Sequence, residues 1–335
     1  MKIRNALLLL PLVAAAACER ADSPLAPSAG LRHDATTLAA PAVSEGYVSS
    51  VDGVSLFYHV EGSGPDTIMV LSGGPGLSYR YMQPDLGPLA RGRTVIYYDQ
   101  RGAGNSTVIY DPALLSMDRQ VADVDAIRQH FGIQKLSLVG HSAGALFATL
   151  YAAAHPANVE RLVLLDPAPA TGAFAAEFAN NRVSRTAPDQ LALQGDLINQ
   201  FLSGTVADPV ASCEVLFHSV FTPYMVDGSK LQHVKFCDEP VPAAANSVFT
   251  VLVGLSALDA SWDVAPYLHQ ITAPTLVVHA TADPIPAASS QYYADGIAGA
   301  QLVTIQNAGH FPWLEQPVAF FSTMETFLRR GDVQQ

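Results

Sequence analysis

Two glycines flank a serine in the stretch LVGHSAGALFATLYAAAHP, residues 138–156, where an apolar run changes into a sequence suited to a helix. Residues 140–144 fit the pattern G-x-S-x-G, in which tiny neighbours allow a strained turn between strand and helix to expose the serine hydroxyl. The pattern alone also fits a small residue at an ordinary strand-to-helix junction. Because an apolar strand precedes it and a helical segment follows, we predict that Ser142 is a nucleophile.

A serine hydroxyl is a poor nucleophile at neutral pH and requires a base that is itself oriented by an acid. The predicted base is His310, in QNAGHFPW, and the predicted acid is Asp283, in TADPIP. Each follows the carboxyl end of an expected strand, as Ser142 does, so the three side chains can meet at one edge of a sheet. Taken singly, Asp283 could cap a helix and His310 could be a partly buried loop residue. Their joint occurrence favours a catalytic triad.

Negative charge that develops on a substrate oxygen needs two preorganised N–H donors. Ala143 directly follows the predicted nucleophile and offers one donor at the start of the helix. The second donor is expected from SGGPG, residues 72–76, where the amide of Gly74 is preferred over that of Gly73. Glycine allows the backbone to approach a substrate closely. The alternative interpretation of SGGPG is a plain glycine turn.

Short apolar strands alternate with helical segments over most of the chain, which is typical of an α/β fold with a mostly parallel sheet and helices on both faces. A hairpin is expected at Asp52-Gly53, and a helix is expected over residues 119–130. Residues 168–264 break this rhythm and are mostly helical in character. We therefore predict a helical cap inserted between two core segments, residues 43–167 and 265–335. Further strands are predicted in TIMVL, TVIYYD, KLSLVG, VERLVLLDP, APTLVVHATAD and AQLVTIQNAGH.

The first 17 residues are typical of a secretory signal, with Lys2 and Arg4 ahead of an apolar stretch that is short for a membrane span. Cys18 directly after AAA resembles a bacterial lipoprotein cleavage site, which predicts lipidation of this cysteine. Ordinary signal cleavage after an A-x-A motif is the alternative. Residues 18–42, rich in Ala, Ser and Pro, are expected to form a flexible tether. We expect an exported protein of the cell envelope, lipid-anchored or otherwise periplasmic or secreted.

The cysteine count agrees with export, since two of the three cysteines remain once Cys18 is assigned to a lipid. Cys213 and Cys237 can form a disulfide in an oxidising compartment, and two unpaired buried thiols are the alternative. The formal net charge of −12 argues against a nucleic-acid partner. Neither the cysteines nor the histidines have the spacing of metal ligands, so no metal or other cofactor is expected. The sequence leaves the oligomeric state open.

Several motifs together resemble the proline iminopeptidase family of α/β-hydrolases: LSGGPG, YYDQRGAGNS, GHSAGA, the aspartate of TADPIP and the GH of NAGH. The resemblance covers roughly residues 47–167 and 265–325. It implies a hydrolase with a helical cap, in which Ser142, Asp283 and His310 act in the chain order of that superfamily. We interpret the DQRG element, residues 99–102, as a structural loop beside the oxyanion turn.

The chain departs from the family at two motif positions. Ser72 stands where a histidine usually precedes GGPG, and Ala143 stands where a tryptophan commonly follows the nucleophile. Family members hold the free amine of the substrate with carboxylates of the cap. The candidates here are Glu214 and Glu239, which lie close in sequence to the two cysteines of the expected disulfide. Solvated surface carboxylates are the alternative interpretation.

Together these features predict a secreted serine hydrolase that acts through an acyl-enzyme. The family resemblance implies an aminopeptidase that releases N-terminal residues from small peptides. A carboxylic-ester hydrolase of small substrates and a catalytically silent binding protein of the envelope are the alternatives. In each case the expected partner is a small molecule or a short peptide, and membrane contact is expected only through the N-terminal lipid.

Overall fold

The computed structural model describes residues 43–237 and 241–329. The predicted signal peptide, the lipidation site at Cys18, the tether and Glu239 therefore lie outside the described residues. In the part of the chain that is described, no helix combines the length and the apolar character needed to cross a membrane.

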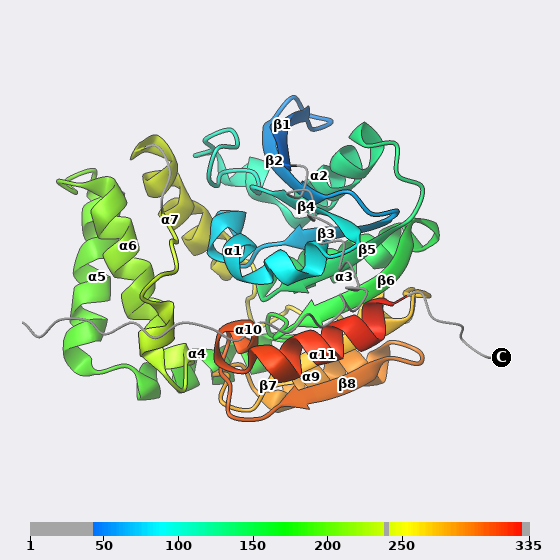
Figure 1. The fold of residues 1–335 in the computed structure, drawn as a ribbon. Coiled ribbons are helices and arrows are strands. Elements are labelled where there is room, and N and C mark those ends of the chain that lie inside the picture. The colour runs from blue at the N-terminus through cyan, green and yellow to red at the C-terminus, as the bar shows by residue number, and fades with distance from the viewer. Residues whose placement is uncertain (1–42, 238–240, 330–335) are drawn as a thin grey trace, which may run out of the picture. The chain divides into compact units, whose positions relative to one another are not determined.

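An eight-stranded sheet forms the centre of the described structure, in the strand order β1-β2-β4-β3-β5-β6-β7-β8 (Figure 1). β1 and β2 form the expected antiparallel hairpin, β2 and β4 are also antiparallel, and the other pairs are parallel. This sheet, covered by helices on both faces, confirms the predicted fold class. The strands are β1 Val43–Ser49, β2 Ser55–Gly62, β3 Asp66–Leu71, β4 Arg93–Tyr98, β5 Leu136–His141, β6 Val159–Leu165, β7 Thr275–Ala280 and β8 Gln301–Ile305.

The central strands are buried on both faces, which is why their sequences are apolar runs and do not alternate with polar residues. In β3, Ile68 and Val70 belong to one hydrophobic cluster, and Met69 and Leu71 belong to the other. Residues of α1 and α11 pack in the first cluster, and residues of α2, α3 and α9 pack in the second. These helices are α1 Gln83–Leu86, α2 Met117–His130, α3 Ala143–Ala154, α9 Ala287–Gly296 and α11 Pro317–Leu328; the short α8 Ala265–Leu268 precedes β7, and α10 Pro312–Glu315 precedes α11.

Helices α4 to α7 occupy the stretch between β6 and β7, where the sequence predicts a cap. Local signals explain their ends. The Thr171 hydroxyl accepts a hydrogen bond from the Phe174 N–H at the start of α4, and the Asp208 carboxylate accepts one from the Ala211 N–H at the start of α6. Gly204, with φ of 68°, ends α5 in the left-handed conformation. The bounds are α4 Gly172–Arg185, α5 Pro188–Ser203, α6 Pro209–Phe221 and α7 Val241–Ser256.

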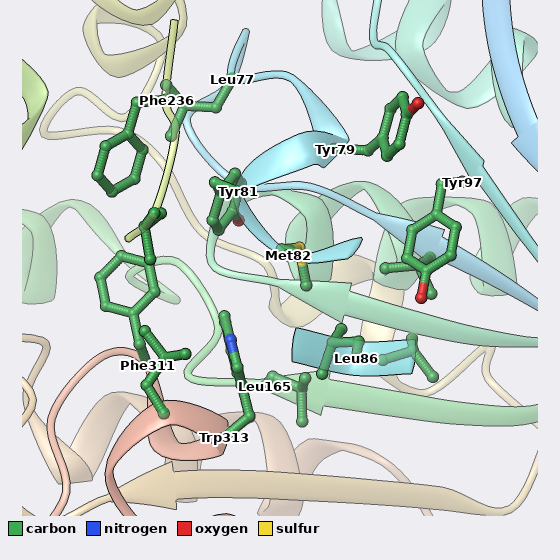
Figure 2. Packing of buried hydrophobic residues seen from close by; sticks show 14 of the residues in the cluster. Leu77, Tyr79, Tyr81, Met82, Leu86, Tyr97, Leu165, Phe236, Phe311 and Trp313 are labelled. Atoms are coloured by element: carbon green, nitrogen blue, oxygen red, sulfur yellow. The ribbon is translucent and has the colours of Figure 1, made fainter. Parts of the chain in front are cut away.

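The expected disulfide is present between Cys213, on α6, and Cys237, with Cα atoms 5.9 Å apart. It closes the irregular connection between α6 and α7, which contains the short 3-10 helices Thr222–Tyr224 and Gly228–Leu231. The ring of Phe236, next to the bridge, stacks on the ring of Tyr81 with centroids 5.8 Å apart (Figure 2). The disulfide therefore anchors a cap segment whose aromatic side chain packs into the first hydrophobic cluster.

Candidate active site

Ser142 lies at the junction of β5 and α3 with backbone angles φ 54° and ψ −119°. A positive φ is strained for a residue with a side chain, so neighbouring contacts must hold it. Its N–H donates to the carbonyl of Leu165 at 2.9 Å. A Cβ on Gly140 would clash with the carbonyl of Gly144, and a Cβ on Gly144 would clash with that of Leu71. The structure thus provides the strand–turn–helix geometry that G-x-S-x-G requires.

The predicted acid and base meet in the structure. Nδ1 of His310 lies 2.5 Å from Oδ2 of Asp283, and the other carboxylate oxygen accepts the Ile285 N–H at 2.7 Å. Burial lowers the pKa of His310 to about 3 and raises the pKa of Asp283 to about 8, an effect that the hydrogen bond from the Ile285 N–H opposes at Asp283. A carboxylate that accepts from Nδ1 leaves Nε2 available as a base.

Ser142 and His310 line one cavity, which brings the predicted nucleophile and base to the same space. Within residues 43–237 and 241–329, no hydrogen bond joins their side chains. The backbone N–H of His310 donates to the carbonyl of Tyr224 at 3.0 Å, so a residue of the cap connection holds the loop that carries the base.

A second buried carboxyl group, which the sequence analysis missed, lies near the acid. Asp166 follows β6 with φ of 40°, and its Oδ1 accepts the Ala280 N–H at 2.7 Å. Burial, and then the charge of Asp283, raise the pKa of Asp166 well above its usual range. Because two carboxylates in one buried site repel each other, the pair favours a state that retains a proton. The sequence feature that could have revealed Asp166 is the position of an aspartate directly after the strand VERLVLL.

A chain of hydrogen bonds connects the glycine loop, the serine turn and the loop of the base. The hydroxyl of Tyr81 lies 2.7 Å from the Gly73 nitrogen and 2.6 Å from Nδ1 of His141, whose Nε2 lies 2.8 Å from the His310 carbonyl. A carbonyl only accepts, so Nε2 of His141 carries a proton. Burial lowers the pKa of His141 well below its usual value, which leaves the ring neutral. Nδ1 therefore accepts from Tyr81, and the Tyr81 oxygen accepts from Gly73.

These hydrogen bonds distinguish between the two candidate amides of the glycine loop. The N–H of Gly73 is used by Tyr81, whereas Gly74 lines the cavity together with Ala143 and Ser142. Neither the Gly74 amide nor the Ala143 amide donates a hydrogen bond to another described residue. Gly74 has φ of 115°, a conformation that residues with side chains rarely adopt. The geometry therefore supports the expected donor pair of Gly74 and Ala143.

The DQRG element makes the contacts of a supporting loop. Nε2 of Gln100 donates to the carbonyl of Ser72, and its Oε1 accepts the Gly76 N–H at 3.0 Å, so one side chain holds both ends of SGGPG. The guanidinium of Arg101 is fully buried and forms ion pairs with Asp123 and Asp52. These contacts agree with the interpretation of DQRG as a structural loop.

The cavity above Ser142 has a volume of about 380 Å³, a size typical of small-molecule sites. Core loops form its base and cap helices form its walls, which are largely apolar. Its ionisable side chains from the described residues are His310, Tyr224 and Arg182. The apolar cap residues include Phe178, Ile198, Leu216, Phe217, Phe221 and Leu252.

Glu214, one of the two predicted amine ligands, is not among the residues that line this cavity. Its Oε1 accepts the Cys237 N–H at 3.0 Å, and its Oε2 lies 3.4 Å from Nε2 of His218. Burial alone would raise the pKa of Glu214, but the hydrogen bonds from His218 and the backbone lower it. Glu214 therefore anchors the disulfide segment in this structure, and the geometry does not support its role as an amine ligand. Glu239 lies outside the described residues.

Comparison with known proteins agrees with this fold and site. A family model described as the alpha/beta hydrolase fold matches residues 66–207. A protein of Variovorax paradoxus named for carbamate hydrolysis is 30% identical over 277 residues, covering 82% of this chain and 96% of that protein. The chain therefore belongs to the α/β-hydrolase superfamily.

Within that superfamily, the chain is similar to proline iminopeptidases. The protein of that name from Heyndrickxia coagulans is 24% identical over 291 residues, covering 85% of this chain and 98% of its own length. The crystal structure of the proline iminopeptidase of Mycobacterium smegmatis has a TM-score of 0.60 and 23% identity, covering 85% of this chain and 97% of that one. The resemblance stated from the motifs is thereby confirmed.

Proposed function

We propose that this protein is a serine hydrolase that cleaves small carboxylic esters through an acyl-enzyme at Ser142. The observation that carries the proposal is the cavity shared by Ser142 and His310, whose walls are apolar and whose cap contributes an arginine as its charged side chain. Such a cavity suits a neutral or anionic acyl group. A buried ammonium group would need a carboxylate partner there.

Each group of the site has a place in this reaction. Nε2 of His310 takes the proton of the Ser142 hydroxyl as the oxygen attacks the carbonyl carbon, and Asp283 orients the imidazole through Nδ1. The amides of Gly74 and Ala143 donate to the oxygen that becomes negative. His310 then gives its proton to the leaving alcohol, and water hydrolyses the acyl-enzyme with the same base. The hydrogen bond between serine and base often tightens only when a substrate is bound.

Aminopeptidase activity is the second candidate, because the relatives reported above include proteins named proline iminopeptidase. This activity requires a group that neutralises the free amine of the substrate. Glu239 is the remaining member of the predicted pair. If it performs this role, Glu239→Gln raises KM for aminoacyl anilides and leaves KM for simple esters unaffected.

The deciding experiment compares rates on short-chain nitrophenyl esters, proline anilide and other aminoacyl anilides. We expect the esters to have the highest kcat/KM and Ser142→Ala to lower kcat at least about a thousandfold. A higher kcat/KM for proline anilide would support the aminopeptidase. A fluorophosphonate probe should label the wild-type serine, and failure to label it would favour a silent binding protein of the envelope.

We also propose that the hydrolase is exported and anchored through a lipid on Cys18. The signal-like residues 1–17 and the small residues before the cysteine support this proposal. Metabolic labelling with a fatty-acid analogue should mark the wild-type protein in a bacterial host and should not mark Cys18→Ser. Equal labelling of both proteins would contradict the anchor.

A further inference from the structure

We propose that Arg182 is a recognition site for a carboxylate, and that esters carrying a carboxylate are the substrate class of this hydrolase. The inference rests on the proposed serine-hydrolase function and adds the charge of the substrate to it. Arg182, on α4, lines the same cavity as Ser142 and His310. Among the described residues that line the cavity, it is the one arginine, and lysine does not occur.

A buried glutamine fixes the orientation of the arginine. Nη1 of Arg182 donates to Oε1 of Gln194 at 3.1 Å. The amide nitrogen of Gln194 donates to the carbonyl and the hydroxyl of Ser219, at 3.0 and 3.1 Å, so its oxygen must face the arginine. Gln194 is 4% exposed. One donor of the guanidinium is thus used for orientation, and the planar group has further N–H donors for a ligand.

The helix that carries Arg182 is fastened to the loop of the catalytic acid. Asn181 donates from Nδ2 to the carbonyl of Pro284 at 2.9 Å. Arg185, one helical turn further, donates to the carbonyls of Ala282 and Asp283. Three hydrogen bonds therefore fix this part of α4 relative to Asp283, and a ligand group held by Arg182 has a defined position relative to the triad.

No carboxylate of the described residues forms an ion pair with Arg182, and none lines the cavity. The wall beside it is apolar: Phe178 lies one turn earlier on α4, and Phe217 and Phe221 come from α6. In such surroundings an arginine–carboxylate pair is stronger than in water, and the guanidinium fork matches the two carboxylate oxygens. Other described arginines do form ion pairs with carboxylates, among them Arg93, Arg101, Arg119, Arg128 and Arg329.

The same arrangement selects against a positively charged substrate group. Burial lowers the pKa of His310, so the imidazole stays neutral and adds no charge to the cavity beside that of Arg182. Asp283 lies behind the imidazole and does not line the cavity. An ammonium group in this space would meet a fixed cation, whereas a carboxylate would neutralise it.

The kinetic test uses monomethyl esters of dicarboxylic acids from succinate to suberate, each beside the methyl ester of the monocarboxylic acid of equal length. Acetate esters of hydroxy acids place the carboxylate on the alcohol side instead. Acid release is followed for the wild type and for Arg182→Gln. A charge-assisted hydrogen bond corresponds to about 10- to 100-fold in affinity. We expect the best carboxylate ester to exceed its neutral counterpart in kcat/KM, and this preference to fall about 10- to 100-fold in Arg182→Gln.

Two controls separate the possible causes. Arg91→Gln removes the same charge from an exposed position that does not line the cavity, and the preference should persist in it. Arg182→Lys keeps the charge but loses the fork, and it should retain part of the preference. A wild type that hydrolyses neutral esters as fast as carboxylate esters, or a preference that survives in Arg182→Gln, overturns the inference and leaves the serine hydrolase intact.

A binding measurement makes the inference independent of turnover. Ser142→Ala and the double variant Ser142→Ala/Arg182→Gln are titrated with intact monomethyl adipate in a calorimeter. Binding at least about tenfold weaker in the double variant supports the carboxylate site, even if no ester is hydrolysed. Equal binding by the two proteins, or binding by neither, overturns the inference. Failure of the fluorophosphonate probe to label Ser142, in contrast, counts against the proposed function alone.

Discussion

Replacing Tyr81 with phenylalanine removes one buried oxygen and keeps the ring. Tyr81 is 1% exposed, and its ring contacts those of Phe236 and Phe311, with centroids 5.8 and 6.0 Å away (Figure 2). Its hydroxyl accepts from the Gly73 N–H and donates to Nδ1 of His141. The substitution therefore leaves two buried polar groups without partners while the aromatic packing persists.

The expected loss of stability follows from those two groups. A buried donor or acceptor that loses its partner costs about 1–3 kcal/mol, so Tyr81→Phe should lower the free energy of unfolding by about 2–6 kcal/mol. Activity should fall as well, because Gly73 precedes the Gly74 amide in the loop that faces the substrate. Complete loss of one oxyanion donor costs about 100- to 1000-fold in kcat, and we expect a smaller decrease of about 10- to 100-fold from a displaced loop.

Tyr97 provides a matched control within the same hydrophobic cluster (Figure 2). It is fully buried, and its hydroxyl has no hydrogen-bond partner among the described residues. Tyr97→Phe makes the same chemical change but removes a group that is already unsatisfied. We expect no loss in the free energy of unfolding and a gain of up to about 1 kcal/mol.

Urea unfolding followed by circular dichroism measures both variants, together with kcat and KM on the best ester. The reasoning depends on hydrogen-bond partners and not on the tyrosine hydroxyl as such. Equal destabilisation by Tyr81→Phe and Tyr97→Phe would refute it. A destabilised Tyr81→Phe with unchanged kcat would keep the energetic argument and refute the connection to the oxyanion loop.

Three further predictions concern the acid, the disulfide and the buried histidine His59. Asp283→Asn should lower kcat strongly, at most about as far as Ser142→Ala, with an unchanged circular dichroism spectrum; an unaffected kcat would remove Asp283 from the triad. Reduction of the Cys213–Cys237 bond, whose sequence separation is 24 residues, should lower the free energy of unfolding by about 3 kcal/mol in a urea titration, and an equally stable reduced protein would contradict this. The hydrogen bond with Glu61 raises the pKa of His59 above 6.5, and Glu45 adds to this effect while burial opposes it. The contribution of His59 to the free energy of unfolding is therefore fully present below pH 6.5 and is lost as the pH rises through the pKa of the folded state. NMR titration of His59 should show this raised pKa and its decrease in Glu61→Gln, and a value at or below 6.5 in the wild type would contradict the prediction.

Local sequence determined the elements and the order of the site residues. The run LSLVGHSAGALFATL contains an apolar strand, two glycines that leave space around a strained serine and a helix, all within a few residues of one another. Such features depend on neighbours along the chain, so they can be read without the fold. The strands before Asp283 and His310 are recognisable for the same reason, and parallel strands place their carboxyl ends at one edge. The two cysteines could also be paired, since they are the ones that remain after Cys18.

Contacts between distant segments were decided only by the tertiary structure. The sequence offered Gly73 and Gly74 as oxyanion donors, and the hydrogen bond of Gly73 to Tyr81 distinguishes them. The hydrogen bond from His141 to the carbonyl of His310 joins residues 169 positions apart, which no periodicity can indicate.

The tertiary structure also decided which side chains line the cavity. Glu214 was expected near the substrate because it lies beside Cys213, but its side chain turns to the Cys237 backbone, and Arg182 lines the cavity instead. The face of a cap helix that meets the core depends on how the helices pack, and packing is set by the sum of many contacts across the molecule. Sequence therefore determined which candidate catalytic residues the core carries, and tertiary packing decided which side chains of the cap line the cavity.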